Sequence, residues 1–545
     1  MHRKCEEVTI NVVGYGKISA CKGDNLGEIL ASKGIMPLPC GGRGLCGLCR
    51  VKVYGETNPI TGNEIVHGLS GNERLACQVI VMGDLVVEAE KPRIISVPRY
   101  SINIPLKQIN PVINIVRLEK PPYINKDYVV INGLKPSNYI LLEDMILSTT
   151  GDPEKILLVD LGTTKIAYQA VTMSGEVIGE KIHINPLNIY GSDIITRITH
   201  ILEKPESLRE MGSSLRKEVN NVAEEYNIGS IFIAGNSVME HLYLGLPIET
   251  LAEKPFQPLF HGPFLTYTYD KPTILAPLIA GYVGGDAYSE LIASLKLALK
   301  KPYMIIDLGT NTEVLLVTND KIYATSTPAG PAFEGHLARG STIVYGGIYK
   351  VEIIGSRNSE PVFNYKYIHK PYGLLGTGII SLVAELLRHK YIDERGRFLK
   401  GYKRINNVKT YVIDKDQQIF FTQKDLREFQ KAYAAVKTAW IILCRRAGIK
   451  CEDLEHVIIA GSFGSNIESR DLIDLGLVPV VENSRLVYAG NMVLSGLKIM
   501  MLDSSMFKIY RSILEKIAHI NLAEDKDYMK TWIKCLNIVS LRGSK

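Results

Sequence analysis

The chain has 545 residues, of which 46% are apolar and 22% charged, and a formal net charge of +6. This length is enough for about three or four domains with separate cores. Charges of both signs are spread along the chain without a block of like charges, so we expect no nucleic-acid partner. No apolar run of about 18 residues is present, so we expect no membrane-spanning helix.

The first residues are charged and lead into an alternating segment rather than an apolar run. This pattern predicts no signal peptide. We therefore expect a cytoplasmic protein, in which the nine cysteines are cluster ligands or thiols rather than disulfides.

Residues 1–92 contain four cysteines in an uneven spacing. Cys40, Cys46 and Cys49 fall in one glycine-rich loop, and Cys77 comes from a distant segment. Three thiolates reach one two-iron cluster only when the chain wraps closely around it, and glycines permit that wrapping. The spacing resembles the ligand loop of a 2Fe-2S ferredoxin, in the adrenodoxin-like variant with five residues in the first gap.

A zinc site with four cysteine ligands is the alternative. Such sites usually contain two short Cys-x2-Cys pairs, whereas Cys77 stands alone. Alternation at 8–13, a short helix at 25–33 and strand-like runs at 51–54 and 85–88 predict a small mixed sheet with one helix, as in β-grasp ferredoxins. We expect this domain, residues 1–92, to carry a 2Fe-2S cluster and an electron.

A proline-rich stretch follows the cysteine-rich domain. Six prolines lie between residues 91 and 122, where they remove amide donors and fix φ. We therefore predict a linker over residues 93–122. Alternating residues return in a small middle segment, for which we predict the bounds 123–154.

From residue 155 onward the chain contains two copies of one pattern. A strand of buried type ends in Asp160 in the first copy and in Asp307 in the second, and a Leu-Gly-Thr turn follows each aspartate. Further along each copy, an apolar strand runs into a glycine and a helix start. We predict a duplicated α/β body with halves at about 155–300 and 301–520, an insertion in the second half, and a tail over 521–545.

Each Asp-Leu-Gly-Thr hairpin brings a carboxylate, backbone amides and hydroxyls together, which suits Mg²⁺ and phosphoryl oxygens. The pair resembles the acetate and sugar kinase, Hsp70 and actin superfamily, in which two hairpins grip the phosphates of ATP. By that resemblance, Asp160 and Asp307 organise Mg²⁺ and the attacking water. The other expected ATP contacts are Gly162, Thr163, Thr164, Gly309, Thr310 and Asn311 at the phosphates, and Gly461, Ser462, Phe463 and Gly464 beside the adenosine.

Two other interpretations of the repeated hairpins exist. No Gly-x4-Gly-Lys-[Ser/Thr] motif is present, which disfavours a P-loop ATPase. A doubly wound core whose aspartates only cap turns stays open as the alternative to a nucleotide clamp.

Four further segments follow the cysteine-rich domain in the sequence and carry a family resemblance, at 277–286, 329–335, 421–427 and 460–464. Together with that domain they are similar to the reductive activators of corrinoid proteins, over nearly the whole chain. The resemblance implies an α/β multidomain fold. Its parts are an N-terminal β-grasp 2Fe-2S ferredoxin domain, a linker with a small middle segment, and a C-terminal duplicated RNase H-like ATPase body of the actin/Hsp70 type.

The same resemblance implies a function. An electron passes from the 2Fe-2S cluster to the cobalt(II) corrinoid of a methyltransferase corrinoid protein, which regenerates cobalt(I) in an ATP-dependent step. It also implies a low-potential electron donor and a homodimer. The segment 373–378 departs from the family pattern and the middle segment is short, which leaves the docking of the partner open.

Three other functions fit the motifs. They are an ATP-dependent electron-donating activator of another metalloenzyme, a small-molecule kinase with a redox-sensing ferredoxin domain, and a module that binds nucleotide only as a structural ligand. Outside the hairpins, Asp286 and Glu334 lie in glycine-rich segments and are candidates for outer contacts to the nucleotide or the partner.

Overall fold

The structure is a computed structural model of the whole chain. It describes residues 6–33, 35–36, 49–61, 64–65, 69–89, 106, 109, 111–118, 126–131, 145–148, 150–309, 311–334, 340, 347–368, 371–461, 467–479 and 485–538.

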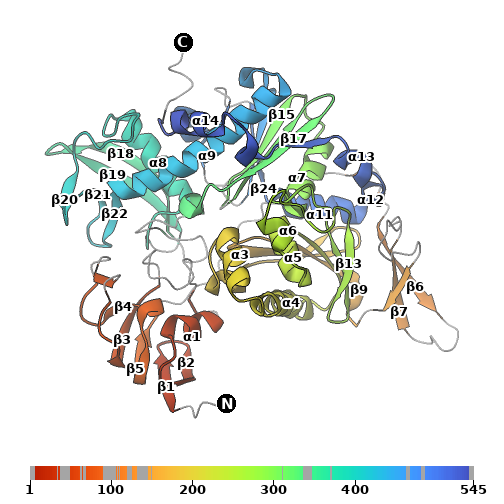
Figure 1. Ribbon diagram of the computed structural model, residues 1–545, viewed down its shortest axis with the longest axis horizontal. Coiled ribbons are helices and arrows are strands. Elements are labelled where there is room, and N and C mark those ends of the chain that lie inside the picture. The colour runs from red at the N-terminus through yellow and green to blue at the C-terminus, as the bar shows by residue number, and fades with distance from the viewer. Residues whose placement is uncertain are drawn as a thin grey trace.

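The N-terminal domain is a five-stranded sheet with one helix packed on it (Figure 1). The strand order is β2-β1-β5-β3-β4, with β1 parallel to β5 and the other pairs antiparallel. This is the mixed sheet with one helix that the sequence predicts. Its elements are β1 (Glu7–Val12), β2 (Gly16–Cys21), α1 (Leu26–Ser32), β3 (Arg50–Thr57), β4 (Glu73–Leu75), the 3-10 helix η1 (Ala76–Gln78) and β5 (Val81–Glu88).

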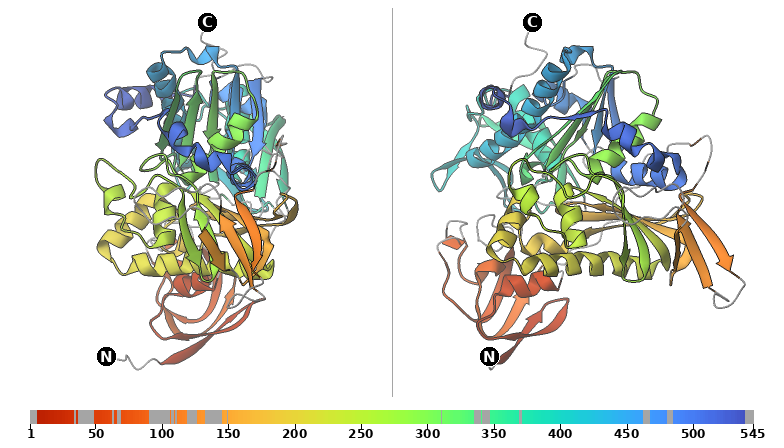
Figure 2. Two further views of the ribbon diagram at one scale, coloured as in Figure 1. Left: turned by 90° about the vertical axis from the view of Figure 1, so that its right-hand side faces the viewer. Right: turned by 45° about the vertical axis from the view of Figure 1, so that its right-hand side comes forward.

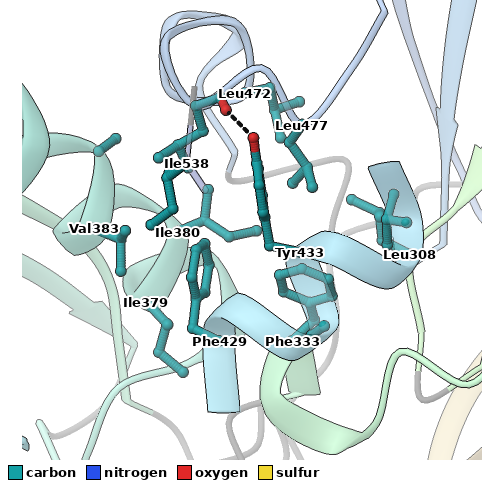
Figure 3. Packing of buried hydrophobic residues seen from close by; sticks show 14 of the residues in the cluster. Leu308, Phe333, Ile379, Ile380, Val383, Phe429, Tyr433, Leu472, Leu477 and Ile538 are labelled. Carbon is teal, nitrogen blue, oxygen red and sulfur yellow. Dashed lines mark hydrogen bonds between the residues drawn. The ribbon is translucent and has the colours of Figure 1, made fainter. Parts of the chain in front are cut away.

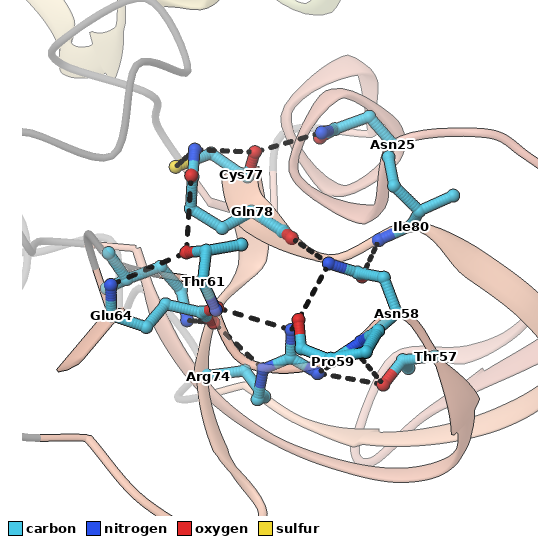
Figure 4. Close-up of polar contacts among 11 residues, drawn as sticks. Asn25, Thr57, Asn58, Pro59, Thr61, Glu64, Arg74, Cys77, Gln78 and Ile80 are labelled. Carbon is cyan, nitrogen blue, oxygen red and sulfur yellow. Dashed lines mark hydrogen bonds and ion pairs between the residues drawn. The ribbon is translucent and has the colours of Figure 1, made fainter.

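A buried ion pair connects Glu64 to Arg74 of β4 (Figure 4). Glu64 is 0% and Arg74 5% exposed, and the Arg74 Nε donates to Glu64 Oε1 at 2.8 Å. The amides of Thr61 and Leu75 donate to the same carboxylate. Burial alone would raise the pKa of Glu64, but the hydrogen bonds from Arg74 and the two amides outweigh it and hold the pKa below its usual value.

We expect Glu64→Ala to lower the free energy of unfolding of the N-terminal domain by about 3–5 kcal/mol, because Arg74 would stay buried without its carboxylate. Since the pKa of Glu64 is lowered, the contribution of the pair is present at neutral pH and is lost as pH falls through the pKa of the folded state. Hydrogen exchange of the full-length protein measures the change. Exposed Glu73 on β4 is the control, because Glu73→Ala is expected to shift stability by less than about 0.5 kcal/mol. Equal rates of hydrogen exchange in Glu64→Ala and Glu73→Ala would contradict the prediction.

The body contains two six-stranded sheets that share the order of five of their strands, and the sixth strand is added at opposite edges (Figure 1). In each, the first strand of the copy pairs antiparallel with the next strand and parallel with a strand from further along the chain. This confirms the duplicated α/β unit. The first sheet has the order β11-β10-β9-β12-β14-β13, from β9 (Asp152–Leu161), β10 (Lys165–Thr172), β11 (Val177–Ile184), β12 (Ile228–Gly235), β13 (Phe264–Thr268) and β14 (Lys271–Leu275). The second has the order β24-β23-β15-β16-β17-β25, from β15 (Tyr303–Asp307), β16 (Thr312–Val317), β17 (Ile322–Thr327), β23 (His456–Ala460), β24 (Leu486–Gly490) and β25 (Ile517–His519).

The helices of the first copy lie between β11 and β15 along the chain. They are the 3-10 helix η2 (Pro186–Ile189), α3 (Ile194–Glu203), α4 (Ser207–Glu225), α5 (Ser237–Leu244), α6 (Glu249–Ala252) and α7 (Gly285–Lys296). The second copy contains η3 (Pro331–Glu334), α8 (Gly376–Arg388), α9 (Gln423–Ala447), η4 (Cys451–Asp453), α10 (Ser469–Leu475), α11 (Met492–Leu502), α12 (Ser505–Lys508), α13 (Tyr510–Leu514), η6 (Leu522–Glu524) and α14 (Tyr528–Cys535).

The predicted insertion of the second copy forms two small antiparallel sheets beside α8 and α9 (Figure 1). One pairs β18 (Gly347–Arg357) with β19 (Glu360–Ile368), and the other joins β20 (Lys403–Ile405), β21 (Val408–Asp414) and β22 (Ile419–Thr422).

Helix α9 is the central helix of the second copy. It begins with a reciprocal cap between Thr422 and Asp425 and ends at Gly448, whose φ of 69° suits glycine. Its apolar face packs into the core shown in Figure 3, where the Tyr433 hydroxyl donates to the Leu475 carbonyl at 2.7 Å. This burial fixes the helix beneath β16 and β17.

Helices α7 and α11 join the two copies. One belongs to the first copy and the other to the second, and they pack on each other within a buried cluster that includes strands of both sheets. A Cβ atom at Gly496 of α11 would lie 1.9 Å from the backbone oxygen of Ser289 on α7. Only glycine permits this approach of the two backbones.

Two segments differ from the predicted boundaries. Strand β6 (Ile113–Leu118) lies inside the predicted linker and pairs with β7 (Lys126–Ile131), which pairs with β8 (Met145–Ser148). The prolines of that region flank this strand rather than interrupt it, so its ladder is intact. The predicted tail contains α14, which packs on α9, and Ile538 beyond it is fully buried.

One cysteine corrects the prediction that the chain contains no disulfide. Cys21 is disulfide-bonded. The other described cysteines, Cys49, Cys77, Cys444, Cys451 and Cys535, form no disulfide. Within the described residues, no helix combines the length and hydrophobicity that crossing a membrane requires.

Candidate functional site

A cavity of about 150 Å³ lies between the two copies of the body. Both predicted catalytic residues line it: Asp160 at the end of β9 and Asp307 at the end of β15. Of the expected phosphate and adenosine contacts, Gly162, Thr163, Thr164, Gly309, Asn311 and Gly461 line the same cavity. Thr310, Ser462, Phe463 and Gly464 lie outside the described residues.

Asp160 is held by a residue from the other copy. The Asn491 side chain, at the start of α11, donates from Nδ2 to Asp160 Oδ2 at 2.6 Å and caps the helix through Oδ1. Burial raises the pKa of Asp160, the bond from Asn491 lowers it, and the nearby Asp286 carboxylate raises it, with a result of about 7. A contact between the copies therefore opposes the effect of burial on the pKa of this carboxylate.

Three more carboxylates line the cavity beside the two predicted aspartates. Asp286 and Glu290 come from one face of α7, and Glu313 comes from β16. Glu290 is 1% exposed, and neither of its carboxylate oxygens has a hydrogen-bond partner. Burial first, and then the neighbouring carboxylates, raise the pKa of Glu290 and of Glu313.

The cavity is therefore acidic, with five carboxylate side chains and one lysine, Lys165, among its described residues. Such a lining supplies many oxygen ligands and little positive charge, so it suits a nucleotide that arrives with a divalent cation. No three His, Cys, Asp or Glu side chains of the described part are arranged to enclose a metal ion. The residues fit Mg²⁺ whose remaining ligands are phosphate oxygens and water, which is its usual coordination with nucleotides.

The sequence pattern predicts a role for Asp286 but not for Glu290, Glu313 or Asn491. A signal for Glu290 exists, because it follows Asp286 by four residues on a helix and so lies on the same face. Glu313 lies on the neighbouring strand β16, directly opposite Asp307. No local signal marks Asn491, which is 331 residues from its partner Asp160.

We expect Mg²⁺-dependent nucleotide binding to weaken as pH falls from about 8 to about 6. Burial raises the pKa of Asp160 to about 7 and also raises the pKa of Asp286, so at the lower pH protons would occupy carboxylates that we expect to bind the cation. Calorimetry with Mg²⁺ and AMP-PNP, a non-hydrolysable ATP analogue, measures the affinity and the protons released. Asn491→Ala should move the midpoint to higher pH because the lowering hydrogen bond is lost. A nucleotide affinity independent of pH would contradict the expected role of Asp160 and Asp286 in binding the cation.

The first hairpin is supported from behind by polar side chains. Asn185 Nδ2 donates to the Gly162 carbonyl at 2.7 Å, and Asn188 Nδ2 donates to the Thr164 carbonyl at 3.1 Å. The buried Arg197 of α3 donates from Nη2 to the Thr163 carbonyl at 2.6 Å. Because the N–H and C=O of a peptide point in opposite directions, carbonyls held from behind direct the following amides the other way.

Two of the four expected cluster ligands lie within the described residues. Cys49 and Cys77 are 2% and 3% exposed and belong to the same core of the N-terminal domain. The Cys77 carbonyl accepts a hydrogen bond from Asn25 Nδ2 at 2.9 Å (Figure 4). Cys40 and Cys46 lie outside the described residues.

Comparisons with known proteins agree on one family. Residues 157–297 match the model of the RACo middle region, and residues 301–542 match the C-terminal ASKHA domain of RACo. The corrinoid activation enzyme RamQ of Eubacterium limosum is 28% identical over 571 residues, which cover 93% of this chain and 95% of RamQ. The [Co(II) methylated amine-specific corrinoid protein] reductase of Methanosarcina barkeri is 28% identical over 277 residues, 47% of this chain and 49% of the reductase.

Another relative matches a shorter part of the chain. One component of the Na(+)-translocating NADH-quinone reductase of Neisseria meningitidis is 39% identical over 88 residues, which are 15% of this chain and 22% of that component. Among solved structures, a reductive activator for corrinoid,iron-sulfur protein superposes with a TM-score of 0.69 at 22% identity and covers 98% of both chains. That likeness confirms the predicted multidomain fold.

Proposed function

We propose that this chain, as a member of the reductive activators of corrinoid proteins, uses ATP to transfer an electron to the cobalt(II) corrinoid of a methyltransferase corrinoid protein. The product is cobalt(I). One observation carries this proposal: a cysteine-bearing ferredoxin-like domain and a duplicated body with one acidic cavity occur in a single chain that matches RamQ over almost its whole length.

The electron carrier in this proposal is a 2Fe-2S cluster held by Cys40, Cys46, Cys49 and Cys77. Such a cluster supplies one-electron transfer at low potential. The protein buries Cys49 and Cys77 in the domain core and supplies Asn25 and Gln78 as neighbours that orient the Cys77 segment. The electron comes from a low-potential donor, and we expect the active form to be a homodimer in the cytoplasm.

The body binds ATP with Mg²⁺ in this proposal. Asp160 and Asp307 hold the cation from opposite copies, and the hairpin residues Gly162–Thr164 and Gly309–Asn311 bind the phosphates. Both aspartates end a buried strand, so the two rigid sheets fix their separation. Closure of the two copies on the nucleotide would bring both hairpins onto one triphosphate.

The energies are compatible with an ATP-driven reduction. A ferredoxin-type cluster works at about −400 mV, and transfer to cobalt(II) is uphill in this family. Each 100 mV costs about 2.3 kcal/mol per electron. A ligand present at about 1,000 times its Kd stabilises the state that binds it by about 4.1 kcal/mol. The free energy of nucleotide binding is therefore large enough to favour a complex in which the electron is transferred.

The decisive experiment mixes the reduced protein with a cobalt(II) corrinoid protein and follows the cobalt(I) spectrum. We expect cobalt(I) to accumulate only when Mg²⁺ and ATP are both present. Cobalt(I) formation without nucleotide would overturn the role of the body. ATP consumption that depends on a small-molecule acceptor instead of the corrinoid protein would identify a kinase.

A further inference from the structure

Residues 185–190, which support the first hairpin, also contact the N-terminal domain. Helix α1 of that domain lies against η2, which begins directly after Asn185 and contains Asn188. The views in Figure 2 place the N-terminal domain beneath the first copy of the body. Next to η2, Tyr190 has a pKa raised to about 12 by burial, by Glu210 and by the carboxylate of Glu28 on α1. The two domains therefore meet at residues 186–190.

On its other side, α1 is packed tightly against a cluster ligand. A Cβ atom on Gly27 would lie 2.7 Å from the Cα of Cys77, so the helix touches the backbone of that residue. Asn25, the N-cap of α1, donates to the Cys77 carbonyl, and the Leu26 amide donates to the Val79 carbonyl at 3.0 Å. A displacement of α1 would thus break contacts to Cys77.

On the side of the body, hydrogen bonds connect η2 and the residue before it to the hairpin. The Asn185 amide donates to the Thr164 carbonyl at 3.0 Å, in addition to the bond from its side chain to Gly162. Arg197 links the hairpin to the same segment, because its Nη2 also donates to Asn188 Oδ1 at 3.0 Å. The hairpin and η2 therefore share one hydrogen-bonded support.

We propose that residues 185–190, with Arg197, are the coupling element of this protein: a triphosphate on the 162–164 hairpin orders this element, which then seats α1 and the cluster-bearing domain on the body. The proposal rests on the proposed function and adds the route by which nucleotide reaches the electron carrier. A ligand that orders the hairpin lowers the cost of ordering the groups bonded to it, which gives positive coupling without a large structural change. By reciprocity, seating of the domain strengthens nucleotide binding by the same factor.

The test is amide hydrogen exchange of the full-length protein with and without Mg²⁺ and AMP-PNP. We expect the nucleotide to slow exchange in the hairpin, in 186–190 and in 26–31. Glu28→Arg, at an exposed position near Tyr190 and Glu210, exchanges like charges for opposite charges across this contact, so it should keep the slowing in the hairpin and enlarge it in 26–31. It should also strengthen AMP-PNP affinity by about fivefold, the lower end of typical coupling.

Glu7→Arg is the matched control, because it makes the same charge change at an exposed position on β1 of the same domain. It should behave as the wild type in both measurements. Slowing in the hairpin with no change in 26–31 of the wild type would overturn the coupling element and leave the nucleotide site intact. Absence of slowing in the hairpin itself would count against the proposed function, so the two failures are distinguishable.

Discussion

Replacing Asp307 by asparagine is expected to lower ATP turnover by about a hundredfold or more, as for loss of one electrostatic group that acts on the transition state. Asp307 ends a buried strand and lines the acidic cavity, where its charge is close to Glu290 and Glu313. The substitution keeps the size of the side chain and removes the charge that we expect to bind the cation. Because the neighbouring Glu290 and Glu313 are buried, water cannot replace that charge efficiently.

Phosphate release in the presence of Mg²⁺ and the corrinoid protein measures the loss. The matched control is Asp320→Asn, an exposed aspartate in the turn between β16 and β17 of the same sheet, which should leave turnover unchanged. The iron content and visible absorbance of the N-terminal domain should be unchanged in both variants. Full turnover in Asp307→Asn would show that the cavity is not the hydrolytic site.

The parts of the fold that follow from local patterns could be predicted from the sequence. Each Asp-Leu-Gly-Thr hairpin is a strand end and a tight turn, so its residues alone specify the geometry that recurs in β9–β10 and β15–β16. The same is true of α9, where Thr422 and Asp425 mark the start and Gly448 the end. Such signals involve neighbours in the chain and need no knowledge of packing.

The rest of the candidate site could not be predicted, because it depends on contacts between segments that are distant in the sequence. Asn491 approaches Asp160 only because α11 packs against α7 and β9, and no pattern near either residue encodes that packing. Glu290 is buried without a hydrogen-bond partner, which a sequence shows only as one more polar residue on a helix. The two boundary errors have a related cause, because β6 and α14 are stabilised by the elements they pair with and not by their own composition.

Cys77→Ala is expected to abolish reduction of the corrinoid protein while leaving nucleotide binding within about twofold of the wild type, because α1 contacts the backbone of residue 77 and these contacts remain. The thiolate of Cys77 is one of four expected ligands, and three cysteines cannot complete the set that a 2Fe-2S cluster takes. Alanine fits the buried position at η1 without a clash, so the domain should keep its fold. After reconstitution with iron and sulfide, visible absorbance per chain should fall sharply.

Cys444→Ala is the control, because Cys444 is equally buried but lies on α9 of the body. It should keep the absorbance and the reduction of cobalt(II). If Cys77→Ala still reduced the corrinoid protein at the wild-type rate, the electron would have to come from elsewhere and the N-terminal domain would have another role. If its absorbance were retained but reduction were lost, Cys77 would not be a cluster ligand and its thiol would act in another step, because the contacts of Gly27 and Asn25 are with the backbone of residue 77, which alanine keeps.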